Sequence, residues 1–325
     1  MRRRIITGVL LLAVSTTFAV VADAQSSGPN GNLPLPPEIL RRRLQDEPFQ
    51  IVAASRAHGG IMGAQKLRLI FPSDGFTADV KWKKAPSDGD SWDNSPRREI
   101  AAYVVQTLFL DPDDYLVPPT VARCIPLDVY RALDVSPHPN VAHGQCVLGM
   151  ISAWVSNVHM PKEPLERSRF ARDTRYANHV GNLNLLTYLI QHRDAKDSNF
   201  LISNDPANPQ VFSIDNGISF SGAYNPFVRH LDHIEVGGVP SRSIDRLRQV
   251  TRADVDRLGV ISELRVDESG VLRSVTPSAN VDPSAGVRIL DGGIQFGLTA
   301  EEIDGVATRL ETLLQRIDRG QLVVF

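Results

Sequence analysis

The alternation of apolar and polar residues predicts strands in the chain. Residues 76–83 alternate strictly, which is typical of a strand with one buried face, made here by Phe76, Ala78, Val80 and Trp82. Lys81 and Lys83 share the opposite, polar face of this strand. Farther along, two short and mostly apolar runs, 200–202 and 211–214, flank a segment rich in Asn and Pro. This arrangement predicts a β-hairpin.

A helical period predicts three further elements. Ser95 and Pro96 form a helix-start signal, and an apolar stripe with helical spacing follows, made by Ile100, Tyr103, Val104, Thr107 and Leu108. Residues 183–190 are apolar over a broad face, so we expect a well-buried helix that runs directly into His192. A last helix follows the N-cap Thr299 and carries a core stripe of Ile303, Val306, Leu310, Leu313 and Leu314.

The first residues have the form of a signal peptide. A basic stretch is followed by the mostly apolar residues 5–21, and residues 22–24 have the small-x-small pattern of a signal-peptidase site. We therefore expect residues 1–24 to be removed and the protein to be exported, as a periplasmic or secreted protein with no stable membrane span after cleavage. An uncleaved membrane anchor is the alternative, because residues 5–21 are at the short limit for a span.

Residues 25–48 are predicted to be a linker or disordered leader. Residues 25–37 are rich in Ser, Gly, Asn and Pro, a composition that does not form a packed core. Residues 39–44 contain an Arg triplet and fit a short helix. Folded structure is expected to begin near Phe49.

Composition bounds the size and the partners of the protein. With 325 residues, of which 42% are hydrophobic and 22% charged, the chain is large enough for one large or two small domains. The formal charge is −2, and removal of residues 1–24 takes away three Arg and one Asp, which changes it to −4. This mild negative charge gives no reason to expect a nucleic-acid partner.

The two cysteines, Cys124 and Cys146, are candidates for a disulfide in an exported protein. A bridge across this loop would stabilise the fold by roughly 3 kcal/mol on the loop-entropy estimate. Two separate buried thiols are the alternative. The scattered His residues do not combine with these cysteines in a spacing that is typical of metal sites.

The candidate chemistry lies in the segment from His192 to Asn199, His-Arg-Asp-Ala-Lys-Asp-Ser-Asn, and in the triplet Asp215-Asn216-Gly217. These two motifs resemble the catalytic loop and the Asp-Phe-Gly triplet of the protein kinases, with Asn216 in place of Phe. Phosphoryl transfer requires a positioned hydroxyl and neutralisation of the charge on the phosphate oxygens. A solvated polar loop is the alternative for either motif taken alone.

The resemblance implies a role for each of these residues. Asp194 would accept the proton of the substrate hydroxyl or orient that hydroxyl, and Lys196 would contact the transferred phosphate. Asn199 and Asp215 offer hard oxygen ligands for Mg²⁺, or Mn²⁺, on bound ATP. The predicted hairpin between the two motifs would return Asp215 to the vicinity of Asn199.

The resemblance also implies ATP-binding residues upstream. Lys81 is preferred over Lys83 as the strand lysine that contacts phosphate, although two lysines on a polar strand face are commonly only solvated. Glu99 adjoins the apolar stripe of its helix and would pair with Lys81, the alternative being an exposed Glu in a first helical turn. Gly60 and Gly63 lie where kinases cover the phosphates with a hairpin, but the full glycine-rich signature is absent.

Three segments are similar to the atypical kinases in particular, a group that includes phosphatidylinositol kinases, secretory-pathway casein kinases and related bacterial proteins. These segments are Glu99-Ile100-Ala101-Ala102-Tyr103 with the following Leu108, then Val117-Pro118-Pro119-Thr120, and residues 240–264, which resemble part of the C-terminal lobe. Several members have Asp-Asn-Gly in place of Asp-Phe-Gly. The similarity implies an α+β, two-lobed kinase-like fold, with a small β-rich N-lobe over 49–150 and a larger helical C-lobe over 151–325.

The function expected from this resemblance is ATP- and Mg²⁺-dependent transfer of a phosphoryl group to a hydroxyl of a protein, lipid or sugar. Two alternatives stay open. One is an exported pseudokinase or nucleotide-binding module, and the other is a kinase-fold nucleotidyl transferase. No Ala-Pro-Glu motif follows Gly217, so the acceptor is left open, as is the oligomeric state.

Overall fold

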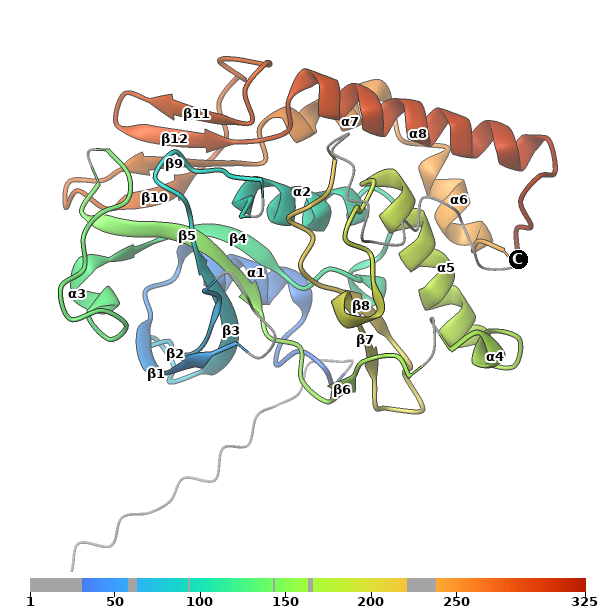
Figure 1. Cartoon of the computed structure of the whole chain (residues 1–325), viewed down its shortest axis with the longest axis horizontal. Helices are drawn as coiled ribbons and strands as arrows, with labels where there is room; N and C mark the ends of the chain where they lie inside the picture. The colour runs from blue at the N-terminus through green and yellow to red at the C-terminus, as the bar shows by residue number, and fades with distance from the viewer. Residues whose placement is uncertain (1–30, 58–62, 93, 143, 163–165, 221–237) are drawn as a thin grey trace, which may run out of the picture.

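The computed structural model describes residues 31–57, 63–92, 94–142, 144–162, 166–220 and 238–325. Within these ranges the protein is a mixed α+β fold, as predicted (Figure 1). The expected signal peptide, residues 1–24, lies outside the described residues. None of the helices in the described ranges is long and apolar enough to cross a membrane.

A five-stranded antiparallel sheet contains the predicted strand 76–83. Its strands, in the order β1-β2-β3-β5-β4 across the sheet, are β1 (Gln50–Arg56), β2 (Gln65–Ile70), β3 (Thr77–Lys84), β5 (Cys146–Ala153) and β4 (Thr120–Pro126). Ala78, Val80 and Trp82 are buried on one face of β3, which confirms the alternation. Phe76 precedes the strand and is only half-buried.

One face of this sheet is covered by the helices α1 (Pro37–Asp46) and α3 (Leu127–Tyr130). Leu40 and Leu44 of α1 are fully buried against strand residues such as Val80. Arg123 of β4 donates hydrogen bonds to the carbonyl oxygens of Gln45 and Glu47, so it holds the end of α1. The described part of the expected leader is therefore folded, and the prediction that folded structure begins near Phe49 was wrong.

The other face of β4 and β5 packs against a second, four-stranded sheet (Figure 1). Its strands, in the order β10-β9-β12-β11, are β10 (Leu272–Val275), β9 (Ser262–Val266), β12 (Gly293–Phe296) and β11 (Val287–Leu290). Residues 262–296 thus share a core with residues 85–148. The expected division at residue 150 differs from this arrangement, because it cuts β5 and assigns the second sheet to a helical lobe.

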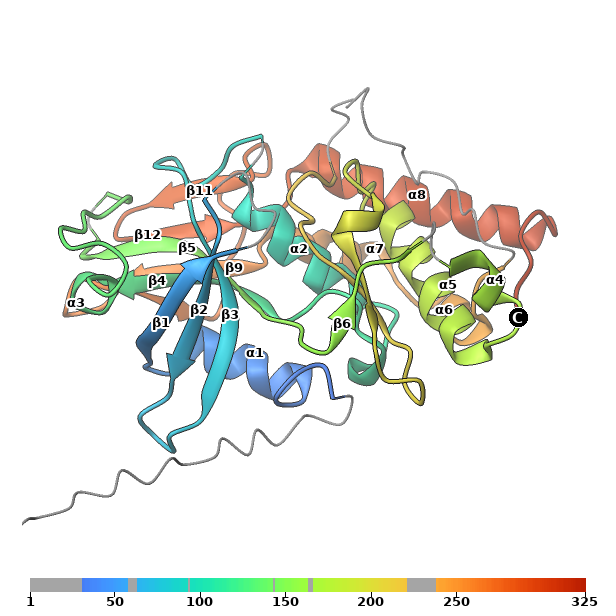
Figure 2. The ribbon, with the colours of Figure 1, turned by 60° about the horizontal axis from the view of Figure 1, so that its bottom comes forward.

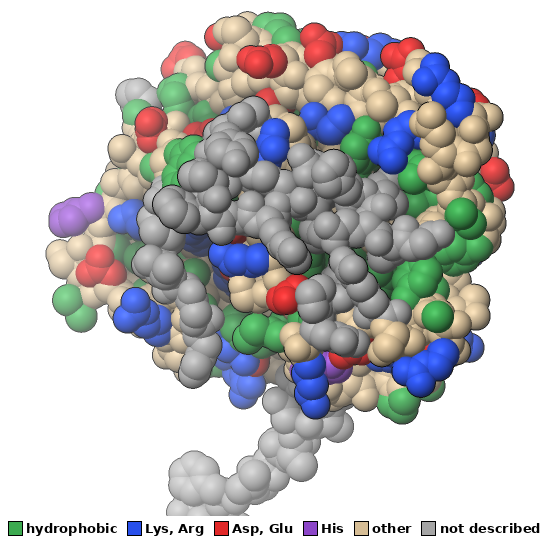
Figure 3. All heavy atoms as spheres, turned by 45° about the vertical axis from the view of Figure 1, so that its right-hand side comes forward, with side chains coloured by type: hydrophobic (Ala, Val, Ile, Leu, Met, Phe, Trp, Pro, Cys, Tyr) green, Lys and Arg blue, Asp and Glu red, His purple; other side chains and the backbone are tan. Residues whose placement is uncertain are grey.

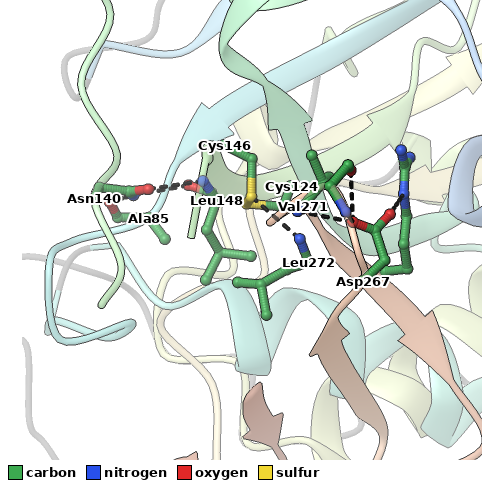
Figure 4. Close-up of a disulfide and its surroundings, with 10 residues drawn as sticks. Ala85, Cys124, Asn140, Cys146, Leu148, Asp267, Val271 and Leu272 are labelled. Carbon is green, nitrogen blue, oxygen red and sulfur yellow. Dashed lines mark hydrogen bonds and ion pairs between the residues drawn. A yellow bond between two sulfur atoms is a disulfide. The ribbon is translucent and has the colours of Figure 1, made fainter. Parts of the chain in front are cut away.

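A disulfide lies in the core between the two sheets (Figure 4). Cys124 and Cys146 are bonded, with 5.4 Å between their Cα atoms, and neither is exposed to solvent. The backbone N–H of Leu272, in β10, donates to Cys146 Sγ at 3.4 Å. The structure therefore selects the disulfide over two separate thiols.

The remaining elements form a second large core, built mainly from helices. These are α4 (Arg167–Phe170), α5 (Thr174–Leu189), α6 (Ser241–Leu247), α7 (Arg252–Asp256), α8 (Ala300–Asp318), and the small sheet of β6 (Val158–His159), β7 (Phe200–Ser203) and β8 (Val211–Ser213). The strands β7 and β8 pair antiparallel, which confirms the predicted hairpin. Thr299 caps α8 in a capping box with Glu302, as expected for its N-cap.

Two helices differ in detail from their predicted form. α5 begins at Thr174, earlier than the apolar run 183–190, because Asp173 caps it by accepting from Tyr176 N–H. α2 (Pro96–Gln106) begins at the expected Pro96, but its buried residues surround the helix instead of forming one stripe, and Thr107 is exposed. This helix lies between α1, the second sheet and the helical core, so it has little free surface (Figure 2).

Candidate functional site

Lys81 of β3 meets two carboxylates that come from different parts of the chain. Its Nζ lies 3.6 Å from Glu99 Oε1, on α2, and forms a short ion pair with Asp215, which follows β8. The Lys81 side chain is 15% exposed and that of Glu99 is 8% exposed. Burial opposes the charge of Lys81, but Glu99 and Asp215 outweigh this effect and raise its pKa. Lys81 is therefore a charged lysine that is mostly, but not fully, shielded from solvent.

Glu99 joins this ion pair to the Asp-Asn-Gly turn. Its Oε2 accepts a hydrogen bond from the backbone N–H of Asn216 at 2.9 Å. The Asn216 side chain is buried and accepts from the Ser213 hydroxyl at 2.7 Å, so it closes the turn locally. Glu99 thus points inward, and one carboxylate fixes β3 and the turn after β8 relative to α2.

A second cluster surrounds Asp194. Lys196 Nζ lies 2.9 and 3.0 Å from the two carboxylate oxygens of Asp194. Asn199, at the end of the short 3₁₀ turn Asp197–Asn199, donates through Nδ2 to Asp194 Oδ2 at 2.8 Å and to its carbonyl oxygen at 2.9 Å. These contacts hold the Asp194 carboxylate in one orientation.

Backbone hydrogen bonds connect the two clusters. Ile214 N–H donates to the Asn199 carbonyl oxygen at 2.9 Å, one residue before Asp215. Arg193 N–H donates to the Ile218 carbonyl oxygen at 2.9 Å, one residue after Gly217. The hairpin therefore returns Asp215 to the vicinity of Asn199, as expected from the sequence.

Asp215 adopts a left-handed backbone conformation with φ of 58°. Such a conformation is uncommon for a non-glycine residue and often marks a functional site. Burial acts to raise the pKa of its carboxyl, but the charge of Lys81, and after it that of Lys83, lowers the pKa below the usual value. The side chain is nonetheless 49% exposed, so it is accessible to a ligand.

His192 lies beneath this region and is 3% exposed. Its ring packs edge-on against Phe200, and among the described residues neither ring nitrogen has a hydrogen-bond partner. Burial lowers its pKa to about 4, in spite of the nearby Asp194 and Asp215. The imidazole is therefore neutral at pH 7.

The other candidate residues are Lys83, Gly60 and Gly63. Lys83 is on the same face of β3 as Lys81, and its charge lowers the pKa of Asp215. The ion pairs with Glu99 and Asp215 described above are those of Lys81. Gly60 lies outside the described residues. Gly63, just before β2, has φ of 74°, which favours glycine, and no hydrogen bond of the described residues joins it to Lys81.

Lysine, arginine, aspartate and glutamate side chains are interspersed among apolar ones over the described part of the face shown in Figure 3.

Asn216 helps to build the site, which the sequence did not lead us to expect, because Asn216 was considered only as a replacement for Phe. Its three-residue spacing from Ser213 is a local signal for a side-chain-closed turn.

The oxygen atoms at this site suit a hard divalent cation. Asn199 uses its Nδ2 group to bind Asp194, which leaves its carbonyl Oδ1, and Asp215 offers a half-exposed carboxylate. The described ranges contain no group of three or more His, Cys, Asp or Glu side chains that could hold a metal ion by itself.

A scan against protein-family models found no matching family, and a search of curated proteins found no match either.

Proposed function

We propose that this protein is an exported, ATP- and Mg²⁺-dependent phosphotransferase with a two-lobed, kinase-like fold. One observation supports the proposal above all. Lys81, Glu99 and Asp215 come from three separate elements and meet in one ion-pair cluster, which a backbone hydrogen bond connects to the Asp194, Lys196 and Asn199 cluster. Removing a charged lysine largely from water is energetically costly, and such groups, held by specific charged partners, cluster at functional sites.

In this proposal the five-stranded sheet and α2 form the small lobe, and the helical core forms the larger one. The site residues lie at the junction, because β3 and α2 supply Lys81 and Glu99, and the segments around β7 and β8 supply the others. The four-stranded sheet would be an addition that packs on the outer face of β4 and β5.

The roles follow from the contacts. Asp194 is oriented by Lys196 and Asn199, so it can position an acceptor hydroxyl and take its proton. Lys81 can exchange its contact with Asp215 for the phosphates of ATP while Glu99 keeps it in place. Asn199 and Asp215 would hold Mg²⁺. Bound Mg²⁺ would supply positive charge that offsets the charge on the phosphate oxygens.

The acceptor is proposed only as a hydroxyl of a protein, lipid or sugar. The disulfide between Cys124 and Cys146 supports export, because disulfides persist mainly in oxidising compartments. Phosphoryl transfer is preferred over a pseudokinase role because Asp194, the residue that would take the hydroxyl proton, is present and oriented. Nucleotidyl transfer would use the same residues, and the labelled-ATP experiment below distinguishes it from phosphoryl transfer.

Incubation of the purified protein with ATP labelled at the γ or the α phosphate, against a panel of protein, lipid and sugar acceptors, tests the proposal. We expect Mg²⁺-dependent transfer of the γ label. Asp194→Asn should reduce the rate by about 10²-fold or more, since general-base catalysis contributes on that order. Asp197→Asn is the matched control, because Asp197 is exposed in the same loop. Transfer of the α label would instead indicate a nucleotidyl transferase, and binding without transfer a pseudokinase.

Nucleotide binding can be tested separately from transfer. MgATP should raise the thermal unfolding temperature of the wild-type protein. Asp215→Ala should abolish this shift while leaving the fold intact, because the variant lacks a metal ligand. An unchanged shift in Asp215→Ala would remove Asp215 from the site.

A further inference from the structure

A cavity of about 320 Å³ lies between α1, α2, β4 and the start of β9. This volume is within the range of small-molecule binding sites. Lys81, Asp194 and Asp215 do not line it, so the cavity is separate from the candidate phosphotransfer site. The elements around it are adjacent in Figure 2, where α1 lies alongside α2.

The apolar part of the wall comes from α2, β4 and the residue before β9. It is made by Ile100, Val104, Val121, Ala122 and Ile261. Tyr103 and Thr107 of α2 also line the cavity. Four of the five residues in the apolar stripe predicted for α2 therefore line this cavity. Ile100 and Tyr103 also belong to packed cores, whereas Thr107 is exposed.

The polar part of the wall comes mainly from α1. Glu38 accepts hydrogen bonds from the hydroxyls of Tyr103 and Tyr115, at 3.1 and 3.4 Å, and pairs with Arg41 at 3.3 Å. Burial, and after it the charge of Glu38, raises the pKa of both phenols, so they remain protonated donors at neutral pH. The hydrogen-bonding capacity of the Glu38 carboxylate is thus largely used.

Arg41 retains capacity for a ligand. Its Nε donates to Glu38 at 3.3 Å and its Nη1 to Gln45 Oε1 at 2.7 Å. Its side chain is 32% exposed, and a guanidinium carries five N–H donors in total. The cavity therefore combines an apolar wall with an accessible cation that has N–H donors left.

We propose that this cavity binds a small amphiphilic anion, with the apolar body against α2 and β4 and a carboxylate on Arg41. A carboxylate matches the guanidinium because the two can form parallel hydrogen bonds. The apolar body would lie against Ile100, Val104 and Val121, where these side chains line the cavity. The binding site does not depend on the proposed phosphotransferase activity.

Isothermal titration calorimetry with decanoate tests the proposal on the full-length mature protein. We expect saturable binding of one decanoate per chain below its micelle concentration. Decanol, which has the same chain and no charge, should bind at least about tenfold more weakly, because it loses the charged hydrogen bonds to Arg41. Absence of saturable decanoate binding, or equal affinity for the two compounds, would overturn the proposal without any variant.

Three variants locate the binding. Arg41→Gln should weaken decanoate at least about tenfold, whereas Arg42→Gln, the same charge change on the exposed side of α1, should leave the affinity within about twofold. Thr107→Trp places an indole at an exposed residue on the cavity wall and should abolish binding. Circular dichroism and thermal unfolding verify each fold. Equal effects of the two arginine changes, or unchanged binding to folded Thr107→Trp, would exclude this cavity as the site.

Discussion

Lys81 and Lys83 differ in their contacts although they share one face of β3. Side chains two residues apart on a strand lie about 7 Å apart along it, so only one of them can contact both Glu99 and the phosphates in good geometry. Lys81 makes the ion pairs with Glu99 and Asp215. The charge of Lys83 also lowers the pKa of Asp215.

We therefore predict that Lys81→Ala reduces the transfer rate by about 10²-fold or more, because it removes a positive charge from the transition state. Lys83→Ala should change the rate by only a few-fold on the same scale. Rates at saturating and at limiting ATP, measured for both variants, separate effects on turnover from effects on binding. The opposite ranking of the two variants would assign the ATP contact to Lys83.

Two buried histidines should make stability depend on pH. Burial lowers the pKa of His179 and of His192 to about 4, from about 6.5 in an unfolded chain. The unfolded state therefore binds more protons between these values, so stability is fully present above pH 6.5 and is lost as the pH falls toward 4. At pH 5 the loss is about 2 kcal/mol for each histidine.

Urea unfolding at pH 7 and at pH 5 measures this loss. His179→Gln cannot take up a proton, so its stability should fall by about 2 kcal/mol less than that of the wild type between the two pH values. His179 lies on α5, away from the candidate site residues, and is therefore the better of the two positions for this test. An identical fall in the two proteins would contradict the prediction.

At the scale of elements, α2 shows where periodicity succeeds and where it fails. The Ser95-Pro96 signal correctly predicted the start of the helix. The position of Glu99 beside the apolar stripe correctly indicated that its side chain points inward. The stripe rule assumes that one face of a helix meets solvent. α2 instead has packed elements on several sides and a cavity on another, and this environment cannot be read from its own residues.

The start of α2 is held by the start of α8. Arg97 donates to Glu302 at 2.5 and 3.1 Å and to Asp90 at 2.6 Å, and Arg98 also pairs with Glu302. Arg97 and Glu302 are both buried. Glu302 in addition accepts from the Thr299 N–H in the capping box of α8. One carboxylate thus connects the helix that carries Glu99 with the last helix of the chain.

We predict that Glu302→Ala destabilises the fold by roughly 3 kcal/mol, because it leaves the buried Arg97 with only part of its partners. Asp304→Ala is the control. Asp304 lies on the same helix as Glu302 but forms an exposed ion pair with Arg252 of α7, so its loss should cost about 1 kcal/mol or less. Urea unfolding of both variants provides the comparison. Equal destabilisation would indicate that the buried pair contributes no more than a surface pair.

At the scale of the whole molecule, the sequence was informative where structure is local. The hairpin between Asn199 and Asp215 and the capped helix α8 were predicted from short segments, and the hairpin explains why the two motifs meet. The four-stranded sheet was not predicted. Its strands are only four or five residues long, and their burial depends on β4 and β5, more than a hundred residues earlier.

The disulfide should be protected by the packing of the whole molecule. Both sulfur atoms are fully buried between β4, β5 and the second sheet, so a thiol reagent cannot reach them in the folded state. We predict that dithiothreitol reduces the native protein only at the rate of unfolding, whereas in denaturant reduction is fast. Alkylation and mass spectrometry over time measure both rates. Rapid reduction of the native protein would show that the second sheet opens readily.

The position of this disulfide also implies an order of events during biosynthesis. Cys124 and Cys146 leave the ribosome before Leu272 and the strands around it, which later cover the sulfur atoms. Oxidation is therefore easiest while the later strands are still absent or undocked. A chain that folded completely with reduced cysteines would enclose two thiols that oxidants could no longer reach. The timing of oxidation relative to docking of the second sheet would then decide which of two covalent forms of the same protein accumulates.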